Sequence, residues 1–362
     1  MKTRAALIAA VALVGCGKKK EEPPPAATTG SATAQPQPEP PKVRPSQQPL
    51  PQLPALELPP DPKREQKVAL GHALFFDKRL SGNNDRACYS CHMNEDGLGG
   101  HDPLAIGSGD KKQTRHAPVL WNTGYFKGAW YWDGRAKTLE ENATAAWAGG
   151  NMGAGKENLE KKAAAIAKIP GYKKLFADAG LTGKADDIAA ALAEYERTFI
   201  CKDTKYDKFA AGDKTALSDQ EQRGLDVFLG KGQCLICHAP PYFSTAMGVE
   251  GGAYFNMGIG TDVPEDQVDV GRMKVTNQPT DWAAFKPPSL RNVTKSPPYF
   301  HNGSVASLEE AVKIMSTGGI KNKNLNPALA DRGLTDAERA DLIAFLGALE
   351  CPGKLEEPKK LP

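Results

Sequence analysis

The chain has 362 residues, of which 46 are Lys or Arg and 43 are Asp or Glu, so its formal net charge at pH 7 is only +3. Hydrophobic residues make up 40% of the sequence, which is enough to bury one large core or two medium ones. So balanced a charge does not indicate a nucleic acid or a charged membrane surface as a partner, and partners have to be inferred from sites.

The first 16 residues have the pattern of an export signal. The basic start Met1–Arg4 is followed by the apolar run Ala5–Val14, which is too short to span a bilayer. The run leads into Cys16, and this ending resembles the lipobox of bacterial lipoproteins, where the cysteine is acylated. We therefore predict a lipoprotein signal peptide over 1–16 and a periplasmic protein anchored to a membrane through Cys16, with ordinary secretion as the alternative.

Residues 17–60 have little with which to build a core. They are rich in Lys, Glu, Pro, Ala and Gln and hold hardly any aromatic or β-branched residues. This composition predicts a disordered, Pro-rich tether that ends where the folded body begins, at residue 61.

From residue 61 onward helical periodicity dominates and strand-like alternation is scarce, which predicts a mainly α fold. Apolar spacing predicts helices over 65–76, 159–176 and 187–199, with a break at Pro170. Three further helices are expected to begin at capping-box pairs, namely Ser218 with Glu221, Ser307 with Glu310, and Thr335 with Glu338. The long Gly- and Pro-rich loops are 96–109, 148–155, 239–264 and 276–298. Such loops are unusual in a compact body unless they wrap a ligand.

Two Cys-x-x-Cys-His motifs, Cys88–His92 and Cys234–His238, identify that ligand. In this motif the two thiols add to the vinyl groups of a haem and the histidine ligates its iron. We predict two covalently bound haem c groups, attached through Cys88, Cys91, Cys234 and Cys237 and ligated by His92 and His238. A zinc site built from the two Cys pairs, or a set of disulfides, is the alternative, and the histidine after both pairs argues against it.

The two halves of the body repeat one theme, because a helix ending in an aromatic-rich turn precedes each motif. This predicts two tandem cytochrome c-like haem domains, over 61–205 and 206–350, followed by a tail over 351–362. Cys201 and Cys351 remain, and they form either a disulfide or two unrelated thiols.

Met315 is a candidate for a sixth iron ligand, since a methionine on the distal side raises the potential of a haem. It shares one face of an expected helix with Leu308 and Val312. That spacing alone favours a core residue over a ligand.

Four segments resemble the bacterial di-haem cytochrome c peroxidase and MauG family: Leu70–Ser81, Tyr131–Glu141, Leu290–Val293 and Pro298–Gly303. The resemblance implies that the N-terminal haem reacts with hydrogen peroxide and that the C-terminal haem receives electrons from a small cytochrome c or a copper protein. It implies that Trp132 lies between the haems. It also places the distal ligand of the electron-accepting haem at Met315, as in the peroxidases, where MauG has a tyrosine.

Two departures from the family pattern concern the N-terminal haem. Where many family members have a second histidine ligand, this chain has Ser108. We therefore predict a haem at His92 that is open, or reversibly capped by His101 or His116, and that needs no reductive activation.

The second departure concerns the acid–base pair that cleaves peroxide. Asn142 stands in the place of the family's Gln, and Gly150–Met152 lies in the region of its Glu. An amide positions peroxide but cannot shuttle a proton, so His101, His116 or Glu157 is left to take this role, or the chemistry has changed.

The family binds calcium between its domains. Here His116 replaces the usual asparagine, while Ser296 and Pro298 match the carbonyl positions. Because histidine is a poor calcium ligand, the resemblance leaves open whether calcium binds at all. The oligomeric state is left open too, with a homodimer among the options.

The sequence thus predicts an exported di-haem peroxidase in which Trp132, Asn142 and His116 are the catalytic candidates. One alternative is a MauG-like enzyme that oxidises a residue of a partner protein. Another is a non-enzymatic di-haem electron carrier or redox sensor.

Overall fold

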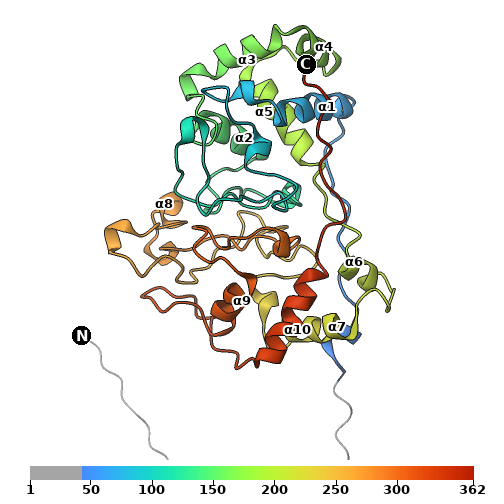
Figure 1. Ribbon diagram of the computed structural model, residues 1–362, viewed down its shortest axis with the longest axis vertical. Helices are drawn as coiled ribbons and strands as arrows, with labels where there is room; N and C mark the ends of the chain where they lie inside the picture. The colour runs from blue at the N-terminus through green and yellow to red at the C-terminus, as the bar shows by residue number, and fades with distance from the viewer. Residues whose placement is uncertain (1–42) are drawn as a thin grey trace, which may run out of the picture. The chain divides into compact units, whose positions relative to one another are not determined.

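The structure is a computed structural model, and it describes residues 43–362 (Figure 1). Helices form the frame of this part of the chain. The predicted signal peptide, Cys16 and the first part of the predicted tether lie outside these residues. The α-helices in this range are α1 (Arg64–Phe75), α2 (Leu139–Ala148), α3 (Leu159–Ala167), α4 (Pro170–Asp178), α5 (Ala185–Glu196), α6 (Lys205–Ala210), α7 (Asp219–Leu229), α8 (Met273–Thr276), α9 (Leu308–Ser316) and α10 (Asp336–Gly347).

The predicted mainly α fold is confirmed, because residues 43–362 contain only isolated β-bridges and no strand. The three capping signals are confirmed as well: the side chains of Ser218, Ser307 and Thr335 each accept the N–H of the residue three positions on. The break predicted at Pro170 within 159–176 is confirmed, because two helices, α3 and α4, occupy this range. Pro170 is the first residue of α4, where its missing N–H costs nothing.

Each half of the molecule is built on a pair of crossing helices that touch through a glycine. A Cβ atom on Gly71 of α1 would lie 1.9 Å from the main-chain oxygen of Ala191 in α5. A Cβ atom on Gly224 of α7 would lie 2.0 Å from the main-chain oxygen of Asp341 in α10. No side chain fits at either crossing, so both pairs of helices depend on glycine for their close approach.

Two hydrophobic cores correspond to these two helix pairs. The first holds buried residues between Leu70 and Cys201 together with Leu355, and the second holds buried residues between Tyr206 and Leu349. The chain from Val43 to Pro362 nevertheless forms one compact unit. The predicted boundaries of the two haem domains, 61–205 and 206–350, therefore stay a prediction.

Residues 43–60 differ from the disordered tether that their composition suggested. Leu50 packs against the second core, and Leu53 and Leu56 pack against a cluster around Tyr125. The hydroxyl of Tyr125 donates to the carbonyl of Pro54 over 2.7 Å, and that of Tyr206 donates to the carbonyl of Pro51 over 3.1 Å. A leucine at every third position and tyrosine donors from both halves hold this Pro-rich segment in place.

The C-terminal segment also contacts the body rather than trailing from it. Asn94 exchanges two hydrogen bonds with the main chain of Leu355, and Tyr89 donates to the carboxylate of Glu357 over 2.7 Å. These contacts return residues 351–362 from the C-terminal half to the first Cys-x-x-Cys-His motif (Figure 1). Buried Leu355, part of the first core, gives the return its apolar anchor.

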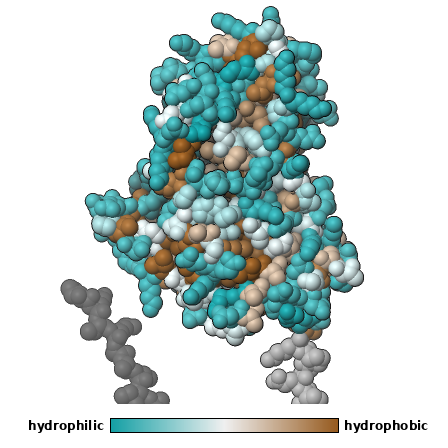
Figure 2. Space-filling model, viewed as in Figure 1, coloured by the Kyte–Doolittle hydropathy of each residue, from teal (hydrophilic) through white to brown (hydrophobic). Residues whose placement is uncertain are grey.

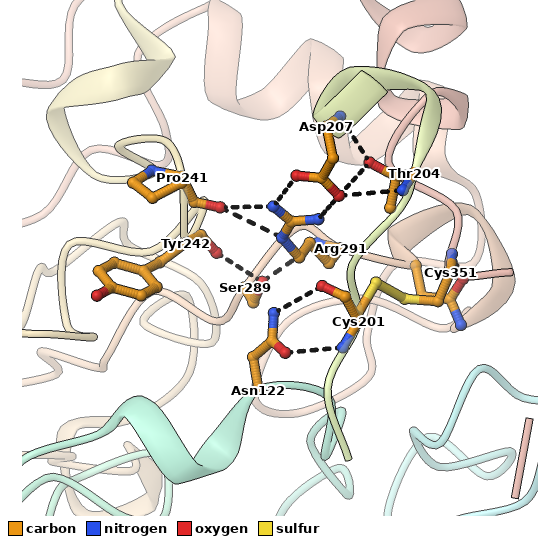
Figure 3. Close-up of a disulfide and its surroundings, with 10 residues drawn as sticks. Asn122, Cys201, Thr204, Asp207, Pro241, Tyr242, Ser289, Arg291 and Cys351 are labelled. Atoms are coloured by element: carbon orange, nitrogen blue, oxygen red, sulfur yellow. Dashed lines mark hydrogen bonds and ion pairs between the residues drawn. A yellow bond between two sulfur atoms is a disulfide. The ribbon is translucent and has the colours of Figure 1, made fainter. Parts of the chain in front are cut away.

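A disulfide joins Cys201, which follows α5, to Cys351, which follows α10 (Figure 3). Beside it the fully buried guanidinium of Arg291 makes two hydrogen bonds of 2.7 Å with the carboxylate of Asp207 in α6. Of the two alternatives for the leftover cysteines, the structure shows the disulfide.

Most of the face drawn in Figure 2 is hydrophilic, and its hydrophobic residues lie in separate patches, a large one of which covers the region of α9. Among residues 43–362, no helix has both the length and the apolar character needed to cross a membrane.

Candidate functional site

The motif Cys234–His238 opens onto the larger of two cavities, with an empty volume of about 1210 Å³ that includes space open to solvent. Cys234, Cys237 and His238 line it on one side, and Met315 of α9 belongs to its wall. A second methionine, Met257, lines it as well. The structure thus brings Met315 into the same cavity as His238, whereas the spacing argument favoured an ordinary core position. Its role as iron ligand stays a prediction.

The motif Cys88–His92 opens onto the second cavity, of about 680 Å³. Cys88, Cys91 and His92 line it together with Asn142 and Met152, which comes from the region of the family's glutamate. Each cavity thus combines the two thiols and the histidine of one motif with apolar side chains, the surroundings that a covalently attached haem needs.

Each motif histidine is held by its Nδ1 atom. The Nδ1 of His92 lies 3.0 Å from the carbonyl oxygen of Leu98, and that of His238 lies 3.1 Å from the carbonyl oxygens of Phe243 and Pro288. An Nδ1–H donated to a carbonyl leaves Nε2 with a free lone pair, the arrangement typical of histidine ligands of metals. Burial lowers the pKa of both imidazoles to about 4, so both are neutral.

The residues present fit two haem groups better than zinc. All four motif cysteines are free thiols, so they do not form disulfides with one another. Within residues 43–362, no three His, Cys, Asp or Glu side chains gather closely enough to hold a metal ion. The zinc alternative therefore has no site in this range, whereas each cavity offers two thiols, one oriented imidazole and largely apolar walls.

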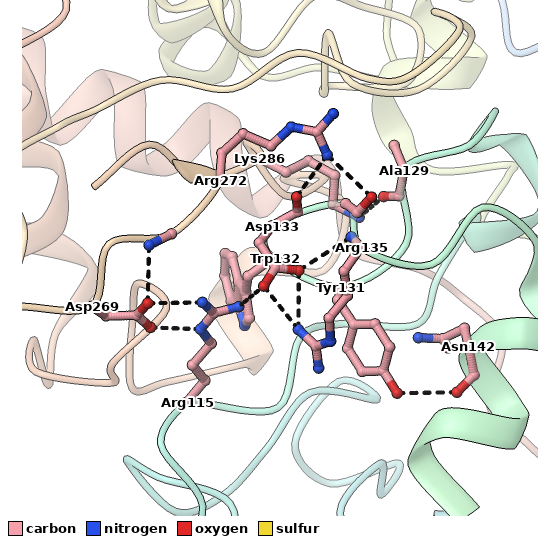
Figure 4. A network of polar contacts seen from close by, with 12 residues as sticks. Arg115, Ala129, Tyr131, Trp132, Asp133, Arg135, Asn142, Asp269, Arg272 and Lys286 are labelled. Carbon is pink, nitrogen blue, oxygen red and sulfur yellow. Dashed lines mark hydrogen bonds and ion pairs between the residues drawn. The ribbon is translucent and has the colours of Figure 1, made fainter. Parts of the chain in front are cut away.

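The neighbouring residues Tyr131 and Trp132 face different parts of the molecule (Figure 4). Trp132 lines the larger cavity and donates its Nε1–H to the carbonyl oxygen of His116 over 2.8 Å. Tyr131 donates its hydroxyl to the main-chain oxygen of Asn142 over 3.1 Å, and Asn142 lines the smaller cavity. Tyr131 has a φ of 64°, an unusual value for a residue with a side chain, and this backbone turn directs the two rings apart.

A network of charges surrounds this dipeptide (Figure 4). The guanidinium of Arg115 binds Asp133 over 2.7 Å and Asp269 over 2.6 Å, while Arg135 binds Asp133 over 3.0 Å and lies 3.5 Å over the ring of Tyr131. Lys286 is buried, and its ammonium donates to the carbonyl oxygen of Ala129 over 2.7 Å. Ion pairs that span residues 115 to 269 tie the two halves of the chain together beside Trp132.

Several predicted residues lie outside the walls of the smaller cavity. His101 is exposed and pairs with Asp96, and His116 is buried with its Nδ1 2.9 Å from the carbonyl oxygen of Asp102. Glu157 is exposed and accepts a hydrogen bond from Asn158, and Ser108 donates to Asp85. His101, His116 and Glu157 therefore do not reach the cavity from these positions.

The predicted calcium residues lie close to the same part of the chain. Ser296 is buried and packs near Gly99, as His116 packs near Gly100. The carbonyl positions of Ser296 and Pro298 as calcium ligands stay a prediction.

The sequence analysis missed Glu196, the carboxylic residue among those that line the smaller cavity. It lies on α5 and is 7% exposed. Its position repeats the spacing of Ile188 and Leu192, which are buried on the same face of the helix. A glutamate that continues an apolar i, i+4 stripe was the signal that could have revealed it.

Comparisons with known proteins point to a di-haem family, which agrees with one cavity at each Cys-x-x-Cys-His motif. A family model described as di-haem cytochrome c peroxidase matches residues 65–215. The chain is 33% identical over 346 residues to the cytochrome-c peroxidase IdrP1 of Denitromonas iodatirespirans, with 87% of this chain and 90% of the relative covered. It is also 33% identical over 299 residues to the methylamine utilization protein MauG of Methylorubrum extorquens, with 80% of each chain covered.

One solved structure, of a MauG-like protein associated with microbial copper homeostasis, superposes with a TM-score of 0.73 and 30% sequence identity. The superposition covers 84% of this chain and 93% of that one. Relatives of this identity and coverage settle the predicted family and the predicted enzyme class. The chain belongs to the di-haem cytochrome c peroxidase and MauG family and is an oxidoreductase of the peroxidase type.

Proposed function

We propose that this chain reduces hydrogen peroxide to water with electrons from a small cytochrome c or copper protein. Electrons enter at the haem of Cys234–His238, with Met315 as its distal ligand, and pass by way of Trp132 to the haem of Cys88–His92. The relatives named cytochrome c peroxidase support peroxide as the substrate.

The observation that carries the proposal is a difference in exposure between the two motifs. The residues between Cys234 and Cys237, Leu235 and Ile236, are 37% and 38% exposed, among the most exposed large hydrophobic residues of 43–362. An exposed apolar pair at a haem attachment site suits a small redox protein that docks briefly, since electron-transfer interfaces are small.

The corresponding edge of the other motif is covered. Tyr89, between Cys88 and Cys91, is partly buried, and its hydroxyl donates to the carboxylate of Glu357 in the C-terminal segment. A donor protein therefore meets the C-terminal motif more readily than the N-terminal one, which supports electron entry at His238.

The smaller cavity has walls suited to a polar substrate. The side chains of Asn142, Asn151 and Arg86 line it next to apolar groups such as Trp147. Amide and guanidinium groups bind and orient a small hydrogen-bonding molecule, and the apolar walls exclude bulk water. The haem, when bound, supplies the redox chemistry.

The proposal is tested by mixing the fully reduced holoprotein with hydrogen peroxide and following both haems by absorption spectroscopy. We expect rapid oxidation of both haems, and steady turnover when reduced cytochrome c is supplied. A protein whose haems stay reduced would contradict the proposal.

One observation favours the electron-carrier alternative. Met152 is buried and lines the cavity of His92, so a thioether is available on that side too. Six-coordinate iron at both haems with negligible turnover would support the carrier. A long-lived oxidised state with little turnover would support a MauG-like oxidation of a partner protein.

We also propose that the protein is exported to the periplasm and is anchored through Cys16. The support is the sequence pattern of residues 1–16.

A further inference from the structure

Glu196 carries a carboxyl group into the cavity of Cys88–His92. It is the last residue of α5, is 7% exposed and lines the cavity together with Asn142. None of the hydrogen bonds and ion pairs found among residues 43–362 involves its carboxyl group, whose oxygens are not sealed within the protein but reach the space of the cavity. A carboxyl group in the wall of a largely apolar cavity is available to act on what the cavity holds.

The cationic side chains nearby are engaged elsewhere. Arg197 binds Glu140 over 2.7 Å and Glu194 over 3.2 Å. Arg86, in the wall of the same cavity, binds Asp110 over 2.7 Å. Because neither guanidinium pairs with Glu196, burial favours the protonated, uncharged form of its carboxyl group.

The electrostatics agree with a carboxyl group that keeps its proton. Burial raises the pKa of Glu196 to about 8, the charge of Glu140 adds to this rise, and Arg197 opposes it. The other titratable groups that face it are Tyr131 and Cys88. Cys88 no longer titrates once it is bound to haem, and burial raises the pKa of Tyr131 to about 12, so Glu196 is the group that exchanges protons near neutral pH.

Other candidates for this task are absent from the walls of the cavity. His101 and Glu157 are exposed, and the Nδ1 of His116 is bound at Asp102. Asn142 lines the cavity, but an amide cannot transfer a proton.

We propose that Glu196 is the proton donor of the peroxide cavity, an inference that rests on the proposed peroxidase function. In the overall reaction the O–O bond breaks, two electrons arrive from the donor protein and two protons from water, so that H₂O₂ yields two H₂O. Glu196 gives one proton to the leaving oxygen and regains one from solvent. Asn142 orients the peroxide beside it.

The test is Glu196→Gln in the haem-loaded protein, because glutamine keeps the shape of the side chain and holds no transferable proton. General acid–base catalysis contributes roughly 10²–10⁴-fold, so turnover with peroxide and reduced cytochrome c is expected to fall by that factor. Glu196→Asp is expected to restore part of it. Glu157→Gln is the matched control, since it removes an exposed carboxylate outside the cavity, and it is expected to leave turnover unchanged.

A second measurement does not depend on turnover. Infrared spectra of the unmodified protein are expected to show the carbonyl band of a protonated carboxylic acid that titrates near pH 8. The band should vanish in Glu196→Gln, shift in Glu196→Asp and persist in Glu157→Gln. These spectra decide the matter for Glu196 even if a variant loses haem.

The outcomes separate this inference from the function on which it rests. An unmodified protein without peroxide turnover refutes the peroxidase, whatever the infrared spectra show. Normal turnover of Glu196→Gln in an active protein refutes the role of Glu196, and so does the absence of the titrating band in the unmodified protein.

Discussion

Asn122 and Asn292 hold the two ends of the disulfide in the same way. The side-chain oxygen of Asn122 accepts the N–H of Cys201 over 2.8 Å (Figure 3). That of Asn292 accepts the N–H of Cys351 over 2.9 Å. Both asparagines have left-handed backbones, with φ of 63° and 66°. The disulfide therefore joins equivalent positions of two repeated halves, 150 residues apart in sequence.

The double variant Cys201→Ser/Cys351→Ser is expected to be less stable. Loss of a native disulfide typically costs about 2–5 kcal/mol, and the long loop between these cysteines favours the upper part of that range. Guanidinium denaturation of the holoprotein measures the change. An unfolding free energy equal to that of the unmodified protein would contradict this expectation.

Gly71→Ala is expected to destabilise the N-terminal half, because the new Cβ atom would lie 1.9 Å from a main-chain oxygen of α5. Overpacking of this kind costs about 1–3 kcal/mol or more. Gly347→Ala at the end of α10 is the matched control, since nothing lies within 4 Å of its new Cβ atom. It is expected to leave the unfolding free energy unchanged or raise it by up to about 1 kcal/mol.

Met315→Leu is expected to lower the reduction potential of the C-terminal haem and change its absorption spectrum, because the variant lacks the proposed thioether ligand. Met257→Leu removes the other methionine of the same cavity and is expected to change neither. Redox titration followed by absorption measures both effects. If Met257→Leu gave the larger shift, the assignment of Met315 would be wrong.

Trp132→Phe is expected to slow the oxidation of the C-terminal haem after peroxide is added to the reduced protein. The reason is that phenylalanine has a smaller ring than the tryptophan that we propose as the relay. The variant also leaves the carbonyl of His116 without its donor, which costs about 1–3 kcal/mol. Trp130→Phe is the control, because the Nε1–H of Trp130 has no partner among residues 43–362. Stopped-flow rates that match in the two variants would exclude Trp132 as the relay.

The raised pKa of Glu196 makes a prediction about stability and pH. The folded protein holds this proton up to about pH 8, whereas the unfolded chain releases it near its ordinary value of 4.5. Glu196 therefore contributes stability that is fully present below pH 4.5 and is lost as the pH rises to about 8. Between these values the unfolding free energy of the unmodified protein should fall relative to that of Glu196→Gln by roughly 1.4 kcal/mol per pH unit. Urea denaturation of both proteins at several pH values would reveal parallel curves if the carboxyl group is not protonated.

Local signals in the sequence were sufficient to predict where several helices begin and where both cavities lie. The capping serines and threonine placed the starts of α7, α9 and α10, and the repeated motifs placed both cavities. These signals act between residues a few positions apart, so they can be read without the fold.

Contacts between distant residues could not be read in that way. Composition suggested a loose tether before residue 61, but tyrosines from both halves hold residues 43–60. Glu157, His101 and His116 were candidates because the position of the family's glutamate lacks a carboxylate, whereas Glu196 enters the cavity from a helix more than 100 residues away from His92. Which polar side chain faces a cavity is decided by how helices cross, and one sequence does not specify that crossing.

The contact between Ser46 and α7 attaches the start of the described chain to the C-terminal half of the molecule. The N–H of Ser46 donates to Asp226 over 2.7 Å, and two residues further along the same helix Phe228 lines the larger cavity. Any pull on the chain before Val43 is transmitted first to the half that holds His238 and Met315. A protein tethered to a membrane from its N-terminal side would thus be held by the half that carries Cys234–His238, the half at which we propose that electrons enter.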